Sequence, residues 1–275
     1  MKRSQITRRA MTLLLSGAIG LGLLLPGAAE VQAGPSARDI MAKVALNRKL
    51  DGSEAVVKMT MYDASGQARV RELTMATKLY DGGKTEKRIY RFLSPPDVKG
   101  TGILVFDYDN AADDVWVYLP ALRKTRRIVS GQHSKSFMGS EFSYGDLNIP
   151  SLDDYTYTLV KEEPAGGEAC YVIDMVPKTA AVASSDGYSK KTYWISKATH
   201  VVRKGLMYGP GGGVVKELTM GDVQLMDSAK GRYRAKRMEM VNKTNGRRSL
   251  FETTQVSFTP NTKDEYFTTR YLERP

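Results

Sequence analysis

The feature that most constrains the fold is a long series of short segments rich in Val, Thr, Tyr and Met, with turn residues between them. All their connections except residues 130–154 are too short for the crossover helix that parallel strands require. We therefore predict a mainly β (α+β) protein with one large antiparallel sheet in a single domain. The predicted strands are 54–63, 68–80, 84–93, 102–109, 114–119, 123–129, 155–162, 169–177, 189–196, 200–208, 214–226, 231–243 and 247–258.

One helical pattern precedes the strands. Its apolar face comprises Ile40, Met41, Val44 and Ala45. Ser36 stands where its hydroxyl can accept a hydrogen bond from the first turn, and the pair at 51–52, Asp-Gly, is a stop signal. We therefore predict a helix over residues 37–50.

The N-terminus has the pattern of an export signal. Basic side chains precede residues 11–25, which are almost wholly apolar but fall short of the roughly 20 residues that a spanning helix needs. Small residues follow, so we predict a signal peptide over 1–33, removed after Ala33, and a mature domain over 34–275. The Arg pair at 8–9 also resembles a twin-arginine signal, which leaves the export route open between that pathway and the general secretory one.

Export narrows the partners that a basic chain can have. The full chain carries 41 Lys and Arg against 30 Asp and Glu, a net charge of +11, and loss of residues 1–33 removes four basic residues and Glu30, which leaves +8. An exported protein meets little nucleic acid, and no nucleic-acid-binding motif is present. Anionic membrane surfaces and acidic proteins therefore remain as the partners that this charge favours.

The residues that carry most enzyme chemistry are scarce. Cys170 is the single cysteine, and His133 and His200 are the two histidines. Together they cannot form a disulfide framework or a thiolate metal site, and no acid, base and nucleophile converge in the sequence. Residues 107–114 lack the turn glycine and the final glutamate of a calcium loop. We predict a protein that is not an enzyme and that has no metal and no cofactor.

The strand at 114–119, "DVWVYL", is apolar on both of its faces. A one-sided antiparallel strand would show polar residues on its exposed face, so both faces of this strand must be covered. In one interpretation, helices or a long loop cover the second face. In the other, one face lines an apolar cavity, and Trp116 and Tyr118 line or gate it.

The long connection at 130–154 lacks strand alternation but is rich in apolar side chains. Such a loop needs something to cover. We therefore predict that its apolar residues also line or gate a cavity; they are Phe137, Met138, Phe142 and Tyr144.

Two basic stretches accompany these segments. Arg126 and Arg127 follow the apolar strand, and we predict that they contact an anionic head group or partner. Core packing or a structural ion pair with Asp146 or Glu141 is the alternative. Later in the chain, strand alternation places a second basic row on one face, which consists of Arg232, Arg234 and Lys236. That row is either a solvated face that discourages edge pairing or a surface that attracts anionic head groups or an acidic, membrane-bound partner.

The run from residue 106 to residue 147 resembles the LolA-like group of outer-membrane lipoprotein-sorting proteins. It contains "WVYLP", a basic "RR" turn and "MGSEFSYGDL" in that order, and the similarity extends over residues 55–272, including "YWISKATHVVRK" at 193–204. The resemblance implies a strongly curved antiparallel sheet of about eleven strands, an incomplete LolA/LolB-like β-barrel closed by an N-terminal helix and a loop or helix lid. It also implies an apolar cavity, a Gram-negative periplasmic location and, for this largely uncharacterised subgroup, association with RND-type exporters.

The favoured hypothesis is a monomeric periplasmic carrier or chaperone. It would bind a lipid or a lipoprotein acyl chain in an apolar cavity during transport between the inner and outer membranes, with transient contact to a membrane surface and to an inner-membrane transporter or outer-membrane acceptor. The alternative is a protein-interaction module of an RND-type exporter or an outer-membrane assembly machine, with its interior filled by its own side chains.

Overall fold

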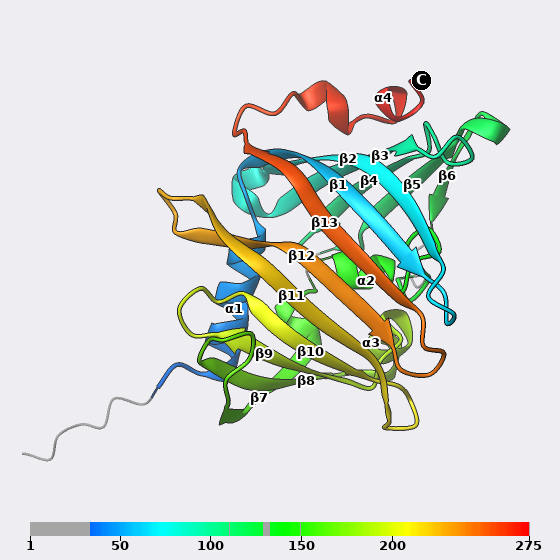
Figure 1. Cartoon of the computed structure of the whole chain (residues 1–275). Coiled ribbons are helices and arrows are strands. Elements are labelled where there is room, and N and C mark those ends of the chain that lie inside the picture. Colours follow the sequence, from blue (N-terminus) through cyan, green and yellow to red (C-terminus); the bar gives the residue numbers. More distant parts are fainter. Residues whose placement is uncertain (1–33, 110, 129–132, 149, 275) are drawn as a thin grey trace, which may run out of the picture. The chain divides into compact units, whose positions relative to one another are not determined.

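The computed structural model describes residues 34–109, 111–128, 133–148 and 150–274, so the predicted signal peptide lies outside the described residues. One sheet of thirteen antiparallel strands dominates residues 35–275 (Figure 1). The strands are β1 (Gly52–Tyr62), β2 (Ala68–Tyr80), β3 (Thr85–Ser94), β4 (Gly102–Tyr108), β5 (Asp114–Leu119), β6 (Lys124–Ile128), β7 (Tyr155–Glu162), β8 (Cys170–Pro177), β9 (Lys190–Ser196), β10 (Val202–Tyr208), β11 (Val214–Asp227), β12 (Arg232–Asn242) and β13 (Arg248–Phe258).

The single antiparallel sheet that the sequence predicts is confirmed, and each predicted strand segment corresponds to one observed strand. The count of about eleven strands that the family resemblance implies is wrong, because the sheet has thirteen. The chain forms two strands more than the family resemblance implies.

The strand order is β6-β5-β4-β3-β2-β1-β13-β12-β11-β10-β9-β8-β7. Successive strands are neighbours, and the first and last strands of the chain pair with each other in the middle of the sheet. The edges are therefore β6 and β7, which do not pair in this order, and the sheet curves without closing (Figure 1). The break in the sheet falls at the one long connection, because that connection replaces a hairpin.

The N-terminal helix α1 spans Ala37–Arg48, close to the predicted range. The Ser36 side chain accepts a hydrogen bond from the backbone N–H of Asp39, as an N-cap serine should. Ile40, Met41 and Val44 are buried, and the helix packs against β7 and β12. The helix thus crosses the concave side of the sheet between an edge strand and a central strand (Figure 1).

The long connection also lies on the concave side. Its described part, residues 133–148, is called the covering segment below, and it contains the short helix α2 (Tyr144–Leu147). The side chain of Ser143 caps the backbone N–H of Asp146, and the Asp146 carboxylate accepts a hydrogen bond from the Ser143 N–H, which forms a capping box. Phe137 and Phe142 are buried against the sheet, so this segment covers the concave face as a loop of this composition must.

The convex face has its own cover, which the sequence did not predict. The chain after β13 forms η4 (Asp264–Phe267) and α4 (Thr269–Leu272), which pack on β3 and β4 outside the curved sheet (Figure 1). Phe267 and Leu272 are buried there. The remaining short elements are η1 (Asp81–Gly83), η2 (Pro120–Leu122), η3 (Leu152–Asp154) and α3 (Ala180–Asp186).

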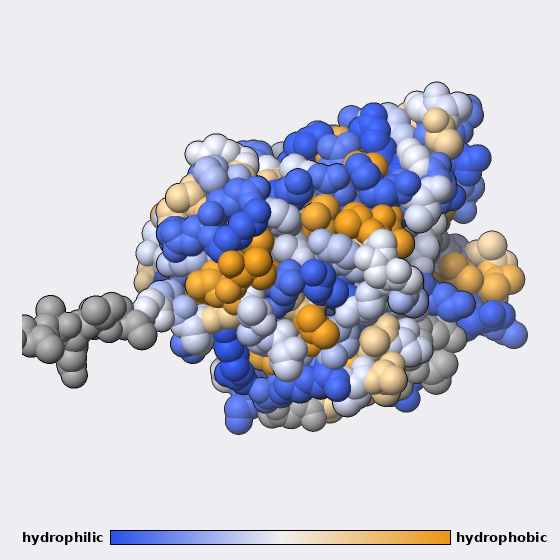
Figure 2. Space-filling model, turned by 90° about the horizontal axis from the view of Figure 1, so that it is seen from below, coloured by the Kyte–Doolittle hydropathy of each residue, from blue (hydrophilic) through white to orange (hydrophobic). Residues whose placement is uncertain are grey.

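In the described part of the chain, no helix is both long and apolar enough to cross a membrane. Figure 2 shows one face of the molecule, on which apolar side chains occur in separate groups between polar ones.

Candidate functional site

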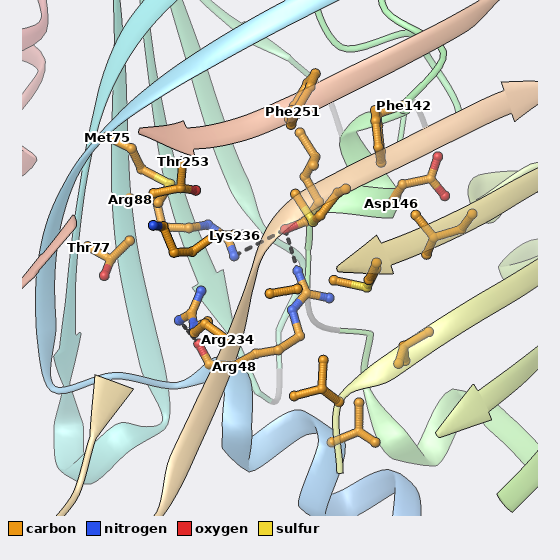
Figure 3. Close-up of a pocket in the computed structure, with 18 of the residues that line it drawn as sticks. Arg48, Met75, Thr77, Arg88, Phe142, Asp146, Arg234, Lys236, Phe251 and Thr253 are labelled. Carbon is orange, nitrogen blue, oxygen red and sulfur yellow. Dashed lines mark hydrogen bonds between the residues drawn. The ribbon is translucent and has the colours of Figure 1, made fainter. Parts of the chain in front are cut away.

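A cavity of about 230 Å³ lies on the concave side, between the sheet, α1 and the covering segment (Figure 3). Strands from both halves of the sheet contribute to it, because the β1–β13 pairing brings the two ends of the chain together at its centre. Aliphatic and thioether side chains make up most of the wall; they include Val57, Leu73, Met75, Met207, Met238 and Met240. Unbranched methionine side chains adapt readily to varied apolar shapes.

The covering segment supplies Phe137 and Phe142 to the cavity wall. The Phe142 ring lies 4.6 Å from that of Phe251 on β13, and the Phe137 ring lies 5.5 Å from that of Tyr90 on β3. These ring contacts tie the segment to both halves of the sheet. The two phenylalanines that the sequence predicted as cavity residues are therefore in the wall.

The other two predicted residues of this segment lie behind the wall. Tyr144 packs on the same apolar cluster, with its ring 5.4 Å from that of Phe137. Met138 also packs there, and its backbone carbonyl accepts a hydrogen bond of 2.5 Å from Arg71. Neither side chain is part of the cavity wall. They support the covering segment instead of lining the cavity.

The structure corrects the predicted placement of Trp116 and Tyr118. Strand alternation puts Val115 and Val117 on the concave face with the covering segment, so Trp116 and Tyr118 face the convex side. There they pack in the cluster formed with the C-terminal residues, and the Trp116 ring lies 5.0 Å from that of Phe106. The strand is apolar on both faces because two different segments cover it, and the cavity uses neither aromatic residue.

Arg126 and Arg127 lie on the edge strand β6, away from the cavity wall, and both are exposed. Arg127 forms an ion pair with Asp114 on the neighbouring strand. Its partner is thus neither Glu141 nor Asp146, the two acids that the sequence suggested as the alternative. Glu141 pairs instead with Arg247, and Asp146 lies 4.0 Å from Lys216.

The later basic row contributes the site residues that sequence reasoning missed. Arg234 and Lys236 on β12 line the cavity, because β12 is a central strand and this face of it is the concave one (Figure 3). This placement of Arg234 and Lys236 does not fit a solvated outer face. One signal was available in the sequence: Arg234 and Lys236 alternate in phase with Met238 and Met240, which share their face.

Arg48 and Arg88 complete a buried basic group at the same end of the cavity (Figure 3). Together with Arg234 they are called the arginine cluster below. Arg48 comes from the last turn of α1, and Arg88 comes from β3. Both donate hydrogen bonds to the carbonyl of Leu147, at 2.8 and 3.4 Å respectively. The cluster thus joins the helix and the sheet to the end of α2.

Arg88 has the fullest set of partners. Its Nη1 donates to Glu86 at 2.9 Å, and its Nη2 donates to Asp107 at 3.0 Å and to the side-chain oxygen of Asn148 at 2.6 Å. Burial opposes the charge of Arg88, but the neighbouring acids outweigh it and raise the pKa of this guanidinium. Arg88 therefore remains charged as a structural tie between β3, β4 and the covering segment.

Arg48 and Arg234 are less well compensated. Arg234 donates from Nη2 to the backbone carbonyl of Arg48, and its nearest carboxylate, Glu86, is 4.0 Å away. Burial lowers the pKa of Arg234 to about 10, with further lowering from Arg48 and Arg88. Burial and the charge of Arg88 likewise lower the pKa of Arg48. The lowered pKa values of Arg48 and Arg234 reflect burial and the proximity of other cationic side chains.

Asp113, which is linked to Arg88 through the side chain of Asn148, has a raised pKa. Burial, followed by the negative charge of Asp107, raises the pKa of Asp113 to about 7. The Asp113 carboxylate accepts a hydrogen bond of 2.6 Å from the side-chain nitrogen of Asn148. Within the described residues, no group of three or more His, Cys, Asp or Glu side chains is placed to hold a metal ion.

Comparison with known proteins adds to this picture. A family model described as an uncharacterized protein family matches residues 84–274. No curated protein matches the sequence. Among solved structures, a domain from Vibrio parahaemolyticus described as an outer membrane lipoprotein-sorting protein is 28% identical, with a TM-score of 0.78 over 86% of this chain and 98% of that one.

Two further structures extend the comparison. A DUF1329 family protein from Desulfovibrio piger is 27% identical, with a TM-score of 0.78 over 86% of this chain and 97% of that one. A LolA superfamily protein from Nitrosomonas europaea has the same fold at 18% identity, with a TM-score of 0.63 over 86% of this chain and 99% of that one. The fold is thus shared by proteins that differ from this chain at most sequence positions.

Proposed function

The chain belongs to a largely uncharacterised family of LolA-like outer-membrane lipoprotein-sorting proteins, and from this premise we propose that it is a non-catalytic periplasmic carrier or chaperone. It binds a lipid or the acyl chain of a lipoprotein in the concave cavity and shields the chain from water between the inner and outer membranes. The observation that carries this proposal is the cavity itself, with its volume of about 230 Å³ and its mostly apolar wall.

The size of the cavity supports binding of a chain segment. At about 30 Å³ for a water-sized group, 230 Å³ is the space of about eight methylene groups. Each buried methylene contributes about 0.8 kcal/mol, so a segment of this length gains about 6 kcal/mol before the costs of association. That gain suits a carrier, which must release its cargo, better than a protein that retains a lipid permanently.

The methionines of the wall support a variable fit. Met75 and Met207 line the cavity on strands of opposite halves of the sheet, and Met238 lines it on the central strand β12. Because a thioether side chain has several rotatable bonds, these residues can move to admit a longer or branched chain. Phe137 and Phe142 hold the covering segment over the same space and are proposed to contact the bound chain.

Export is part of this proposal. The mature domain over residues 34–275 would act in the periplasm after removal of residues 1–33 as a signal peptide. Expression in a Gram-negative host with recovery from the periplasm, followed by intact-mass measurement, checks it. A mass that corresponds to a start at Gly34 is expected, and an uncleaved chain in the cytoplasm would contradict it.

A pair of variants on one strand tests whether the cavity is the binding site. Thr253 on β13 lines the cavity (Figure 3), and the adjacent Thr254 is exposed. Thr253→Trp places an indole in the space proposed for the chain, and Thr254→Trp places the same indole in solvent. The assay is native mass spectrometry of delipidated protein mixed with palmitate-containing mixed micelles, together with the fluorescence of the neutral probe N-phenyl-1-naphthylamine.

The wild type and Thr254→Trp should take up lipid and probe, and Thr253→Trp should lose at least tenfold in affinity. The carrier proposal is refuted if the wild type takes up neither lipid nor probe, and that result would favour the alternative of a protein-interaction module. Equal uptake by both variants would place the binding site outside the cavity.

A further inference from the structure

Within the described residues, three buried side-chain atoms at the arginine cluster make no hydrogen bond: the Nε of Arg234, the Nε of Arg88 and Oε1 of Glu86. The Glu86 Oε1 has only the ionic contact with Arg234, at 4.0 Å. The Arg234 side chain retains 26% of its accessible surface although it is enclosed by the sheet, α1 and the other arginines. Arg234 is one of the residues that line the cavity (Figure 3).

The charges around the cluster do not balance. The three guanidiniums of Arg48, Arg88 and Arg234 face the carboxylates of Glu86 and Asp107, and Arg88 makes the close contacts to both. Asp113 adds only a partial charge near neutral pH because its pKa is about 7. A cation out of water is costly unless an anion or strong acceptors compensate it. One more negative charge beside the arginine cluster would therefore be electrostatically favourable.

Lys236 adds a further cation next to this space. It lies two residues after Arg234 on the same face of β12 and lines the cavity (Figure 3). Its nearest carboxylate is that of Asp222, 3.7 Å away, and the Asp222 side chain is 52% exposed. The pairing is thus long and partly solvated, which makes the Lys236 ammonium group available to a second anion.

Two acidic residues line the cavity, Glu86 and Asp146. Glu86 is the carboxylate already paired with Arg88 at 2.9 Å, and Asp146 does not offset the remaining cations. Asp146 is engaged by the N–H of Ser143, the hydroxyl of Tyr188 at 3.1 Å and Lys216 at 4.0 Å. It belongs to the covering segment, apart from the arginines in the close-up view (Figure 3). The cavity thus has a cationic end and a long apolar wall, the division expected for an amphiphile with a negative head.

We propose that the cavity binds an anionic amphiphile, with its carboxylate or phosphate head group on Arg234 and Lys236 and its hydrocarbon chain along the methionine-lined wall. This inference rests on the proposed function and adds that the head group of the bound molecule is negatively charged. The planar guanidinium of Arg234, which lines the cavity, can offer two N–H groups as a fork, the geometry that suits two oxygens of one head group. Arg48 and Arg88 position Arg234 and hold the covering segment.

A matched series of ligands tests the charge class on the wild-type protein. Delipidated mature protein is loaded with N-phenyl-1-naphthylamine, which is then displaced by dodecanoate, dodecyl phosphate, dodecanol or dodecyltrimethylammonium. A hydrogen bond to a charged group contributes on the order of 10- to 100-fold in affinity, so both anions should compete about 10- to 100-fold better than dodecanol. The cation should be the weakest competitor. The carboxylate and phosphate arms show which head group is preferred.

Variants on β12 then locate the effect. Arg234→Met keeps the length of the side chain and removes the charge, and it should abolish most of the preference for anions over dodecanol. Arg234→Lys should retain part of the preference. Arg237→Met is the control, because Arg237 lies on the opposite face of the same strand and pairs with Glu239 at 3.1 Å. It should leave the preference unchanged.

The outcomes separate this inference from the proposed function. If the wild type binds neither the probe nor any of the four ligands, the carrier function fails. If all four compete equally in the wild type, the cavity binds chains without regard to charge, and only the present inference is overturned. If Arg234→Met does not fold by circular dichroism, Lys236→Met replaces it, and an unchanged anion preference in that variant contradicts the role of Lys236.

Discussion

Removal of the Arg88 side chain is the sharpest test of how the cluster holds the site together. Only 5% of the Arg88 side chain is exposed, and it bonds to Glu86 at 2.9 Å and to Asp107 at 3.0 Å. In Arg88→Met, the Glu86 carboxylate, which is 3% exposed, keeps only the distant Arg234 at 4.0 Å among these cations. The variant therefore leaves a buried negative charge poorly compensated.

The magnitude follows from that loss. Breaking a buried ion pair by removing one partner costs about 3–5 kcal/mol of folding free energy. For a domain of this size, each kcal/mol lowers the melting temperature by about 2–4 °C, so the expected decrease is about 6–20 °C. Arg88 also bonds to Asn148 at 2.6 Å, so the amide protons of the covering segment should exchange faster with solvent.

The assay is urea unfolding and calorimetry of the wild type, Arg88→Met, Glu86→Gln and the double variant. Because Glu86→Gln removes the charge that Arg88→Met leaves behind, the double variant should lose at least 1 kcal/mol less than the sum of the two single losses. A cost below about 1 kcal/mol for Arg88→Met, or strictly additive losses, would refute the account of Arg88 as a buried tie.

Two further predictions concern residues near the cavity and behind the sheet. Burial and Asp107 raise the pKa of Asp113 from 3.8 to about 7, so the folded state keeps a proton that the unfolded state releases, and stability should fall as the pH rises from about 4 to about 7. Asp113→Asn should remove this decrease, which is on the order of 2–4 kcal/mol, in urea titrations between pH 5 and pH 8; an unchanged pH profile would contradict the pKa assignment. Trp116→Ala should cost about 1–3 kcal/mol of stability, because the half-buried indole packs under the C-terminal residues, but lipid uptake should not change. Loss of uptake at unchanged stability would return Trp116 to the binding site.

The local structure was readable from the sequence because its signals are local. The periodicity of two and the turn residues between segments located every strand of the sheet, and Ser36 located the start of α1. The composition of the covering segment indicated that it packs on something apolar, and Phe137 and Phe142 do so. The "WVYLP" and "MGSEFSYGDL" motifs identified the family.

Which face of each strand meets which partner was decided by the tertiary structure. Trp116 and Val115 are equally apolar, and nothing local distinguishes the side covered by residues 133–148 from the side covered by Phe267 and Leu272. In the same way, Arg234 looks like a surface residue until the pairing of β1 with β13 makes β12 a central strand. Alternation determines that two residues share a face, but only the packing of segments distant in sequence determines whether that face meets water, the core or a cavity.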